Sequence, residues 1–261
     1  MSLIGEERKK IILDILNLEG KVRSADLAKK LKVSNEMIRR YLEDLESEKK
    51  LRRIYGGAVK IELEREEQTY LKREVVQVEE KKRIGRAAAE LLEDNDVIFI
   101  DDGSTTMQII HYLQNKQNIT IIVFSFDILN LLMNYQKEGL FTGQIYLLGG
   151  KVTSKYSRVS GGLAESMAEN FRVDKAFISV DGFIVDGGIT GFDIERGYLI
   201  RKIVSLAQLT VIMTDHTKFG GIHPYKVIGL EDIDIIISDV ETPSQWAPAL
   251  SRSNVIWIHA N

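Results

Sequence analysis

The 261-residue sequence contains no cysteine, which excludes disulfide bonds, thiolate catalysis and cysteine metal sites. No apolar run approaches the roughly 20 residues that a membrane-spanning helix needs, so we expect no membrane partner. The residues before Ile4 show no signal-peptide pattern, and a cytoplasmic protein is expected. With 3 prolines, 44% hydrophobic and 28% charged residues, the composition is typical of a soluble globular protein of one or two domains.

The common nucleotide-binding and hydrolase signatures are also absent. The chain has no Gly-x-Gly-x-x-Gly after a strand, no phosphate loop ending in Gly-Lys-Ser/Thr and no nucleophile elbow. Its four histidines, His111, His216, His223 and His259, do not form a metal-spaced pair. We therefore expect neither a metal ion nor a cofactor.

Positive charge is concentrated in the first quarter of the chain. Residues 1–59 carry a net charge of +4, from 14 Lys and Arg against 10 Asp and Glu, within a total of −3. This charge is too small to prove nucleic-acid binding, but it shows where such binding would occur.

Three short helices are predicted in this basic region. The first carries the apolar stripe of residues 11–16 and stops at Gly20, Ser24 is expected to cap the second, and Ser34 to cap the third. Two short helices joined by about three residues match a helix-turn-helix, whose second helix enters the major groove of DNA.

A cationic β-like segment follows the third helix and predicts a wing beside the groove. Four of the five residues 49–53 are basic, and Gly56-Gly57 then forms a turn. The alternative is a small helical bundle with a solvated charged surface. DNA binding is favoured because Ser34, Arg39-Arg40, the basic segment and the glycine pair follow one another within 24 residues. The residues predicted to contact DNA are Ser34, Asn35, Glu36, Met37, Arg39, Arg40, Lys49, Lys50, Arg52, Arg53 and Tyr55.

After residue 59 the periodic pattern of apolar residues gives way to a highly charged segment. We predict a winged helix-turn-helix domain at 1–59, a linker at 60–78 that lacks Pro and Gly, and a second domain at 79–261. In the second domain, strands are predicted at 97–100, 119–124, 144–148, 176–180, 209–214 and 233–237, and helices near 105–115, 127–137, 162–170 and 193–207. This alternation predicts an α/β fold with a mostly parallel sheet covered on both faces.

Polar loops follow these strands and are expected to meet at one edge of the sheet, where ligands bind. Backbone N–H groups near Gly103 and the hydroxyls of residues 104–106 can donate to a phosphate at a helix N-terminus, whereas the carboxylates of residues 101–102 should face sugar hydroxyls or cap the helix. In any one loop, turn formation alone is the alternative explanation. The predicted ligand-binding residues are Asp101, Asp102, Gly103, Ser104, Thr105, Thr106, Ser125, Gly150, Lys151, Asp181, Gly182 and Lys218.

Both halves resemble one known family. Residues 33–59, VSNEMIRRYLEDLESEKKLRRIYGGAV, resemble the winged helix-turn-helix of DeoR-type bacterial transcription regulators. The motifs KKRIGRAAAELL, IDDGSTT, LLGGK, DKAFISVDGF, GGIT and DHTKFG, between about Lys81 and Asp239, resemble the sensor domain of the same regulators. That domain is similar in fold to ribose phosphate isomerase and coenzyme A transferases, and it binds phosphorylated sugars as effectors.

The resemblance implies a winged helix-turn-helix joined to a Rossmann-like α/β sensor domain. It further implies a repressor of a carbohydrate-utilisation operon, which binds double-stranded operator DNA as a dimer or tetramer and responds to a phosphorylated sugar. Met37 and Tyr41 replace the family's usual Thr and Asp, and Phe124 replaces an Asn. The operator sequence and the sugar are therefore not carried over from any relative.

Two other functions are compatible with the sequence. The first is an active sugar-phosphate isomerase or hydrolase with an attached DNA-binding domain, which needs a positioned base and a group that stabilises the enediolate. The chain keeps Asp181-Gly182, but the apolar Phe183-Ile184 follows and Glu195 lacks partner groups, so we expect no enzyme and no catalytic residue. The second is a constitutive DNA-binding protein whose larger domain only forms oligomers.

Overall fold

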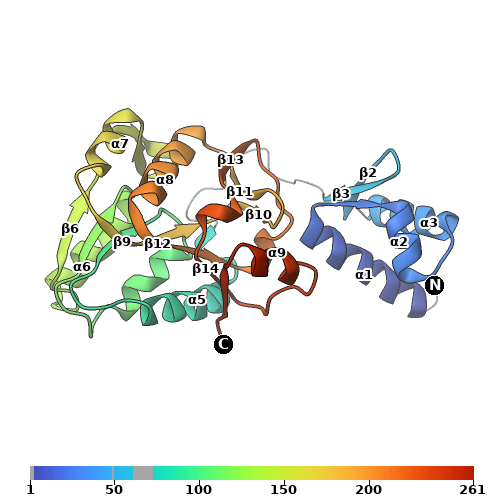
Figure 1. Cartoon of the computed structure of the whole chain (residues 1–261), viewed down its shortest axis with the longest axis horizontal. Coiled ribbons are helices and arrows are strands. Elements are labelled where there is room, and N and C mark those ends of the chain that lie inside the picture. The colour runs from blue at the N-terminus through green and yellow to red at the C-terminus, as the bar shows by residue number, and fades with distance from the viewer. Residues whose placement is uncertain (1–2, 49, 61–72) are drawn as a thin grey trace.

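The chain folds into a small N-terminal and a large C-terminal unit, shown in the computed structural model of Figure 1. The structure describes residues 3–48, 50–60 and 73–261. Lys49 and most of the predicted linker, residues 61–72, lie outside this part of the chain.

The N-terminal unit has the elements of a winged helix-turn-helix. They are α1 (Leu3–Glu19), β1 (Lys21–Arg23), α2 (Ser24–Leu31), α3 (Asn35–Ser47), β2 (Leu51–Ile54) and β3 (Gly57–Lys60), and the strands form an antiparallel sheet of order β1-β3-β2. Apolar side chains at helical spacing, such as Ile12, Leu16, Ile38 and Leu42, pack into one core and hold the three helices together.

One of the two predicted helix caps is confirmed. The Ser34 hydroxyl accepts a hydrogen bond from the Met37 N–H at 3.2 Å and so begins α3. The prediction for Ser24 is wrong, because this residue is already helical and the N-cap is Arg23, which makes no side-chain cap. Residues 21–23 pair with β3, and this pairing keeps the backbone extended up to Arg23.

The C-terminal unit is built on a seven-stranded parallel sheet. A parallel sheet and six of these strands were predicted, whereas the strand at residues 256–259 was not. The strand order of the sheet is β15-β14-β12-β9-β4-β5-β6. These strands are β4 (Val97–Ile100), β5 (Thr120–Val123), β6 (Gln144–Leu147), β9 (Val173–Ser179), β12 (Ala207–Thr214), β14 (Ile235–Ser238) and β15 (Ile256–His259). The chain starts at the interior strand β4, adds β5 and β6 on one side, and then crosses to the central strand β9 on the other.

Helices cover both faces of this sheet (Figure 1). The helices are α5 (Val78–Glu90), the 3₁₀ helix η1 (Thr106–Tyr112), α6 (Phe126–Lys137), α7 (Gly162–Ala168), α8 (Ile194–Leu206) and α9 (Ala247–Arg252). Alternate strand residues define two cores: Phe99 packs with α7 and α8, whereas Ile98 and Ile100 pack with α5, η1 and α6. Both faces are buried, as expected for a parallel sheet.

The segment after β4 differs from its prediction. A helix was predicted at 105–115, but residues 106–112 form a short 3₁₀ helix. Thr105, Thr106, Ile109 and Ile110 are β-branched, and such residues disfavour an α-helix. A seven-residue 3₁₀ turn has no long helix dipole, so any anion bound here must be held chiefly by other groups.

Small strands that the sequence patterns did not predict surround the main sheet. They are the hairpin β7 (Lys151–Thr153) and β8 (Arg158–Ser160), and the antiparallel sheet of β10 (Gly182–Ile184), β11 (Gly188–Gly191) and β13 (Tyr225–Ile228). Segments of three or four residues are too short to show a clear alternation of apolar and polar residues.

Candidate nucleic-acid interface and anion-binding cavity

The outer face of α3 is polar and exposed. Ile38, Leu42 and Leu45 bury one side of this helix, and the opposite side leaves residues 34–37 and 39–40 in solvent. Neither Arg39 nor Arg40 forms an ion pair within the described part of the chain. These two guanidinium groups are therefore available to DNA phosphates or to base edges.

The β2–β3 hairpin extends beside α3 as a wing. Tyr55 is fully exposed at its tip, and Arg52 is exposed on β2. Arg53 instead holds the wing against α3, since its backbone N–H donates to Glu46 Oε1 at 2.8 Å and its Nη1 to Glu43 Oε1 at 2.7 Å. Lys50 pairs with Glu48 at 2.6 Å. Among the predicted wing cations that the structure describes, only Arg52 has no carboxylate partner.

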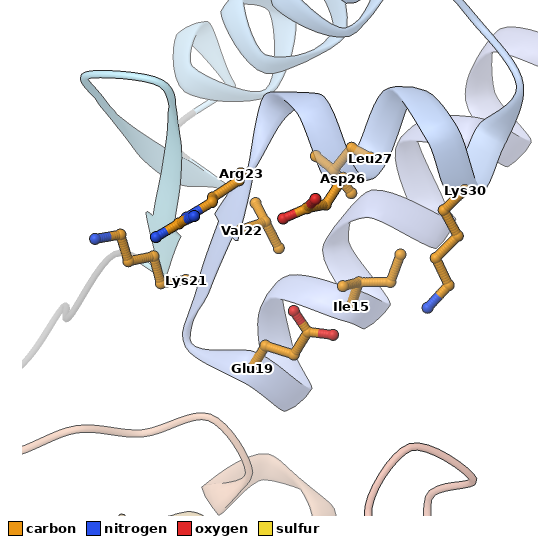
Figure 2. A pocket seen from close by; sticks show the side chains of 8 residues that line it. All are labelled: Ile15, Glu19, Lys21, Val22, Arg23, Asp26, Leu27 and Lys30. Carbon is orange, nitrogen blue, oxygen red and sulfur yellow. The ribbon is translucent and has the colours of Figure 1, made fainter. Parts of the chain in front are cut away.

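A surface cavity of about 270 Å³ lies in the N-terminal unit between α1, β1 and α2 (Figure 2). The carboxylates of Glu19 and Asp26 lie beside it, whereas Lys21 and Arg23 extend toward the β2–β3 hairpin. Its apolar wall, which includes Val22, belongs to the domain core. Since acidic and basic groups are mixed here, this cavity has no clear preference for an anion.

A second cavity, of about 230 Å³, lies at the carboxyl ends of β4, β9 and β12. β9 lies between β4 and β12. After β4, β5 and β6 the chain crosses to the other side of β4 to form β9, and open α/β sheets bind ligands at such a switch point. The lining residues are Arg73, Val76, Lys81, Gly103, Ser104, Thr105, Ser179, Val180, Asp181, Asp215, Thr217 and Lys218.

Lys81 brings a buried positive charge to this cavity. Its side chain is only 4% exposed, and its ammonium group donates to the backbone oxygen of Arg73 at 2.5 Å. Burial lowers the pKa of Lys81 to about 8, the nearby Asp215 opposes this shift, and Lys218 and Arg73 add to it. No carboxylate of the described residues forms a salt bridge with Lys81. An anion in the cavity would stabilise the ammonium form.

Two hydroxyl groups face the same cavity. The Ser104 and Thr105 side chains are 5% and 6% exposed, and neither hydroxyl has a hydrogen-bond partner within the described residues. The Thr106 hydroxyl, by contrast, donates to the backbone oxygens of Asp101 and Gly103 at 2.7 and 2.9 Å, so it stabilises the turn. Gly103 lies so close to β9 that a Cβ there would be 2.2 Å from the Ser179 hydroxyl oxygen.

The two carboxylates at the start of this turn are engaged by arginines. Arg196 contacts Asp101 through Nη2 and donates from Nε to Asp102 Oδ1 at 2.8 Å, and Arg158 contacts Asp102 through Nη1. Burial opposes ionisation of Asp102, but Arg158 and Arg196 hold its pKa well below the usual range. Burial raises the pKa of Asp101 to about 6. Neither carboxylate lines the cavity, so their evident role is to position the turn.

The other predicted ligand-binding residues lie in different parts of the C-terminal unit. Ser125 caps α6 by accepting from the Ile128 N–H, and Gly182 packs against Gly221. Lys151, after β6, pairs with Glu195 at 3.1 Å. Of the twelve predicted residues, those that line the cavity are Gly103, Ser104, Thr105, Asp181 and Lys218.

The strand order explains why the loops after β5 and β6 are not part of the cavity. Both strands lie on the side of β4 that is opposite β9. With neighbouring strands about 4.8 Å apart, their loops are farther from β9 and β12, whose ends form the rest of the cavity. Glu195, the base considered for an isomerase, accepts hydrogen bonds from Lys151 and from Ser160 at 2.9 Å and does not line the cavity. The carboxylates that line the cavity are Asp181 and Asp215.

Arg73 and Lys81 line the cavity but were not predicted from the sequence as ligand-binding residues, although the position of Lys81 in its helix indicates a buried cation. Lys81 lies on the same helical stripe as Ile84, Gly85 and Ala88, all buried on α5. A lysine on an otherwise apolar stripe indicates a buried cation. Arg73 lies in the charged segment before α5, where no pattern distinguishes it.

Within the described ranges, no three His, Cys, Asp or Glu side chains are grouped to hold a metal ion. Within the same ranges, no helix is long and apolar enough to cross a membrane.

Comparisons with known proteins match both units. A family model described as "DeoR-like helix-turn-helix domain" matches residues 8–64, and one described as "DeoR C terminal sensor domain" matches residues 76–240. The chain is 33% identical to the HTH-type transcriptional repressor GlcR of Bacillus subtilis over 250 residues, which cover 96% of this chain and 94% of that protein. It is 27% identical to the glycerol-3-phosphate regulon repressor of Escherichia coli, over 91% of this chain and 92% of that protein.

Similarity to solved structures is weaker. Ribose 5-phosphate isomerase A from Methanocaldococcus jannaschii aligns with 53% of this chain and 52% of its own, at 19% identity and a TM-score of 0.38. A likeness at this level carries no functional argument.

Proposed function

The chain belongs to the DeoR family of transcriptional regulators, and on that premise we propose that it represses a carbohydrate-utilisation operon under the control of a phosphorylated sugar. The sugar phosphate binds in the cavity over β4, β9 and β12. Because bacterial DNA lies in the cytoplasm, this function places the protein there.

The buried ammonium group of Lys81 is the observation that carries the proposal. Arg73 and Lys218 bring two further cations to the same cavity, and Ser104 and Thr105 add hydroxyl donors. A phosphate monoester has a charge of −1.5 to −2 near neutral pH and three acceptor oxygens, so it matches these donors in both charge and geometry.

The same cavity also offers acceptors for the hydroxyl groups of a sugar or polyol. The carboxylates of Asp181 and Asp215 line it and can accept hydrogen bonds from hydroxyl groups. The volume of about 230 Å³ is smaller than pockets for drug-sized ligands, which start at about 300 Å³. A small phosphorylated metabolite therefore fits better than a nucleotide.

On the DNA side, α3 enters the major groove and the wing contacts the backbone. One winged module reads few base pairs, so a homodimer or tetramer on repeated half-sites is needed for specific binding. The ligand alters operator affinity because it binds two arrangements of the protein unequally, and the same coupling lets operator DNA alter ligand affinity.

Thermal unfolding tests the proposed ligand class. The full chain is heated with hexose phosphates, pentose phosphates and glycerol 3-phosphate, each paired with its unphosphorylated form, because a ligand of the native state raises the midpoint. At least one phosphorylated compound raises the midpoint and its unphosphorylated partner does not. Ser104→Ala/Thr105→Ala removes two donors and reduces this shift. The idea fails if no phosphorylated compound changes the midpoint.

A further inference from the structure

The loop of residues 215–222 lies between the cavity and the N-terminal unit. On one side, Asp215, Thr217 and Lys218 line the cavity. On the other side, the ammonium group of Lys60 donates to the backbone oxygen of Phe219 at 3.0 Å and to that of Thr217 at 3.4 Å. Lys60 is the last residue of β3 in the winged domain. One short loop thus contacts both the cavity and the DNA-binding unit.

A close backbone contact lies beside Lys60. Gly20 (φ 68°) and Gly220 (φ 71°) meet so closely that a Cβ on Gly20 would be 2.5 Å from the Gly220 oxygen. A Cβ on Gly220 would be 2.0 Å from the oxygen of Asn17. The Lys60 N–H also donates to the Gly20 oxygen at 3.0 Å, which connects Lys60 to the residue that follows α1. Leu18 packs against the core of the C-terminal unit.

The loop is anchored in its middle. Phe219 is buried and packs edge-on against Trp246, with ring centroids 4.8 Å apart, and the Gly220 N–H donates to the Phe183 oxygen at 2.9 Å. Lys218 is immediately before this anchor and Gly220 immediately after it. The Phe219 carbonyl oxygen that accepts from Lys60 therefore lies directly between a residue of the cavity and the glycine that contacts the N-terminal unit.

Electrostatics connects Lys60 to the cavity as well. Burial lowers the pKa of Lys60, the positive charge of Lys218 lowers it further, and Asp215 opposes the shift. The two ammonium groups therefore repel one another across the loop. An anion beside Lys218 reduces this repulsion and stabilises the arrangement in which Lys60 is docked.

We propose that loop 215–222 transmits occupancy of the cavity to the DNA-binding domain through the contact of Lys60 with the Thr217 and Phe219 carbonyl groups. The ligand part of this coupling rests on the function proposed above for the cavity. Linkage requires the converse effect, so DNA binding changes the affinity of the cavity for its ligand. If the loop carries this coupling by shifting between two arrangements, DNA alters the loop in the absence of ligand as well.

Hydrogen exchange of the full chain tests the coupling without any sugar phosphate. A duplex selected from a random-sequence library by the wild-type protein, called the selected duplex, serves as the DNA. Adding it changes the exchange of amides 215–222 at least twofold in the wild type and leaves them unchanged in Lys60→Met. Lys60→Arg, which retains a cationic donor, restores the response.

Lys21→Met is the matched control. Lys21 is exposed on β1, which pairs with β3, and its substitution removes the same charge without touching the loop. This variant responds like the wild type. The coupling is overturned if the selected duplex changes loop exchange equally in the wild type and Lys60→Met, or in neither.

A second readout separates this proposal from the one on the cavity. With a phosphorylated compound that raises the unfolding midpoint, the affinity for the selected duplex changes at least tenfold in the wild type. In Lys60→Met the change is less than threefold, although the compound still raises the midpoint. If no compound raises the midpoint, the ligand proposal fails, whereas the exchange result still decides whether the loop couples to DNA.

Discussion

At the scale of single residues, Lys81 is a buried charge that lowers stability, and the proposed function gives it a role in binding the phosphate. Replacing Lys81 with methionine keeps the length of the side chain and removes a buried charge whose pKa is lowered to about 8. We expect Lys81→Met to raise the free energy of unfolding of the unliganded protein at pH 7 by on the order of 1 to 3 kcal/mol and to abolish the midpoint shift by phosphorylated sugars. Thermal unfolding measures both effects.

Lys82→Met is the control for this substitution. Lys82 is the next residue on α5, but it is half exposed and pairs with Glu79 at 2.8 Å. Its loss changes the free energy of unfolding by less than about 0.5 kcal/mol and retains the ligand response. A ligand response that survives in Lys81→Met as well would contradict the assignment of Lys81 to the phosphate.

The lowered pKa of Lys81 also predicts a pH dependence. The folded-state pKa of about 8 lies below the ordinary value of 10.5, so the free protein loses this positive charge as the pH rises through 8. A phosphate ester is already a dianion above pH 7 and binds the charged form, so its affinity falls about tenfold between pH 7 and pH 9. The charged groups that face Lys81 are Arg73, Glu74, Asp215 and Lys218.

Isothermal titration calorimetry across this pH range measures the effect. Lys218→Met lowers the affinity but retains most of the pH dependence, because Lys81 remains. An affinity that is constant from pH 7 to pH 9 in the wild type would show that Lys81 does not bind the phosphate.

At the scale of elements, we expect different effects from alanine substitutions of the two wing arginines, Arg52 and Arg53. Arg52 is exposed and unpaired within the described chain, so Arg52→Ala weakens binding to the selected duplex and lowers the slope of log affinity against log salt by about 1. Arg53 pairs with Glu43 on α3, so Arg53→Ala loosens the wing and destabilises the domain by about 0.5 kcal/mol. Fluorescence anisotropy at several salt concentrations and thermal unfolding distinguish the two variants. Equal salt slopes in Arg52→Ala and the wild type would exclude a phosphate contact.

The strands and helices that carry the site were largely predictable from local patterns, whereas the composition of the site was not. The run Val97–Ile100 is short, apolar and mostly β-branched, and a turn at Gly103–Thr105 follows it, so a buried strand is predicted here. Lys151 and Asp215 both follow strands, and only the strand order places Asp215 at the cavity and Lys151 beside Glu195. Strand order depends on packing between distant segments, and no local pattern of apolar residues encodes it.

At the scale of the whole molecule, the proposed function requires two winged domains on one DNA site. We expect sedimentation velocity to show a dimer or tetramer at micromolar concentration. Footprinting on the selected duplex should protect two half-sites whose centres are separated by one or more helical turns of about 10 base pairs. A monomer that protects a single half-site with full affinity would contradict this assembly.

Control of the operator by the cavity is tested most directly by the affinity for the selected duplex with and without the phosphorylated compound that raises the unfolding midpoint. Anisotropy titrations compare the wild type with Lys81→Met, and the unphosphorylated form of the compound serves as the ligand control. We expect the phosphorylated compound to change the affinity of the wild type at least tenfold, the unphosphorylated form to have no effect, and Lys81→Met to respond to neither. If the compound binds the wild type but leaves its DNA affinity unchanged, the cavity does not control binding to the operator and the proposed regulation is wrong.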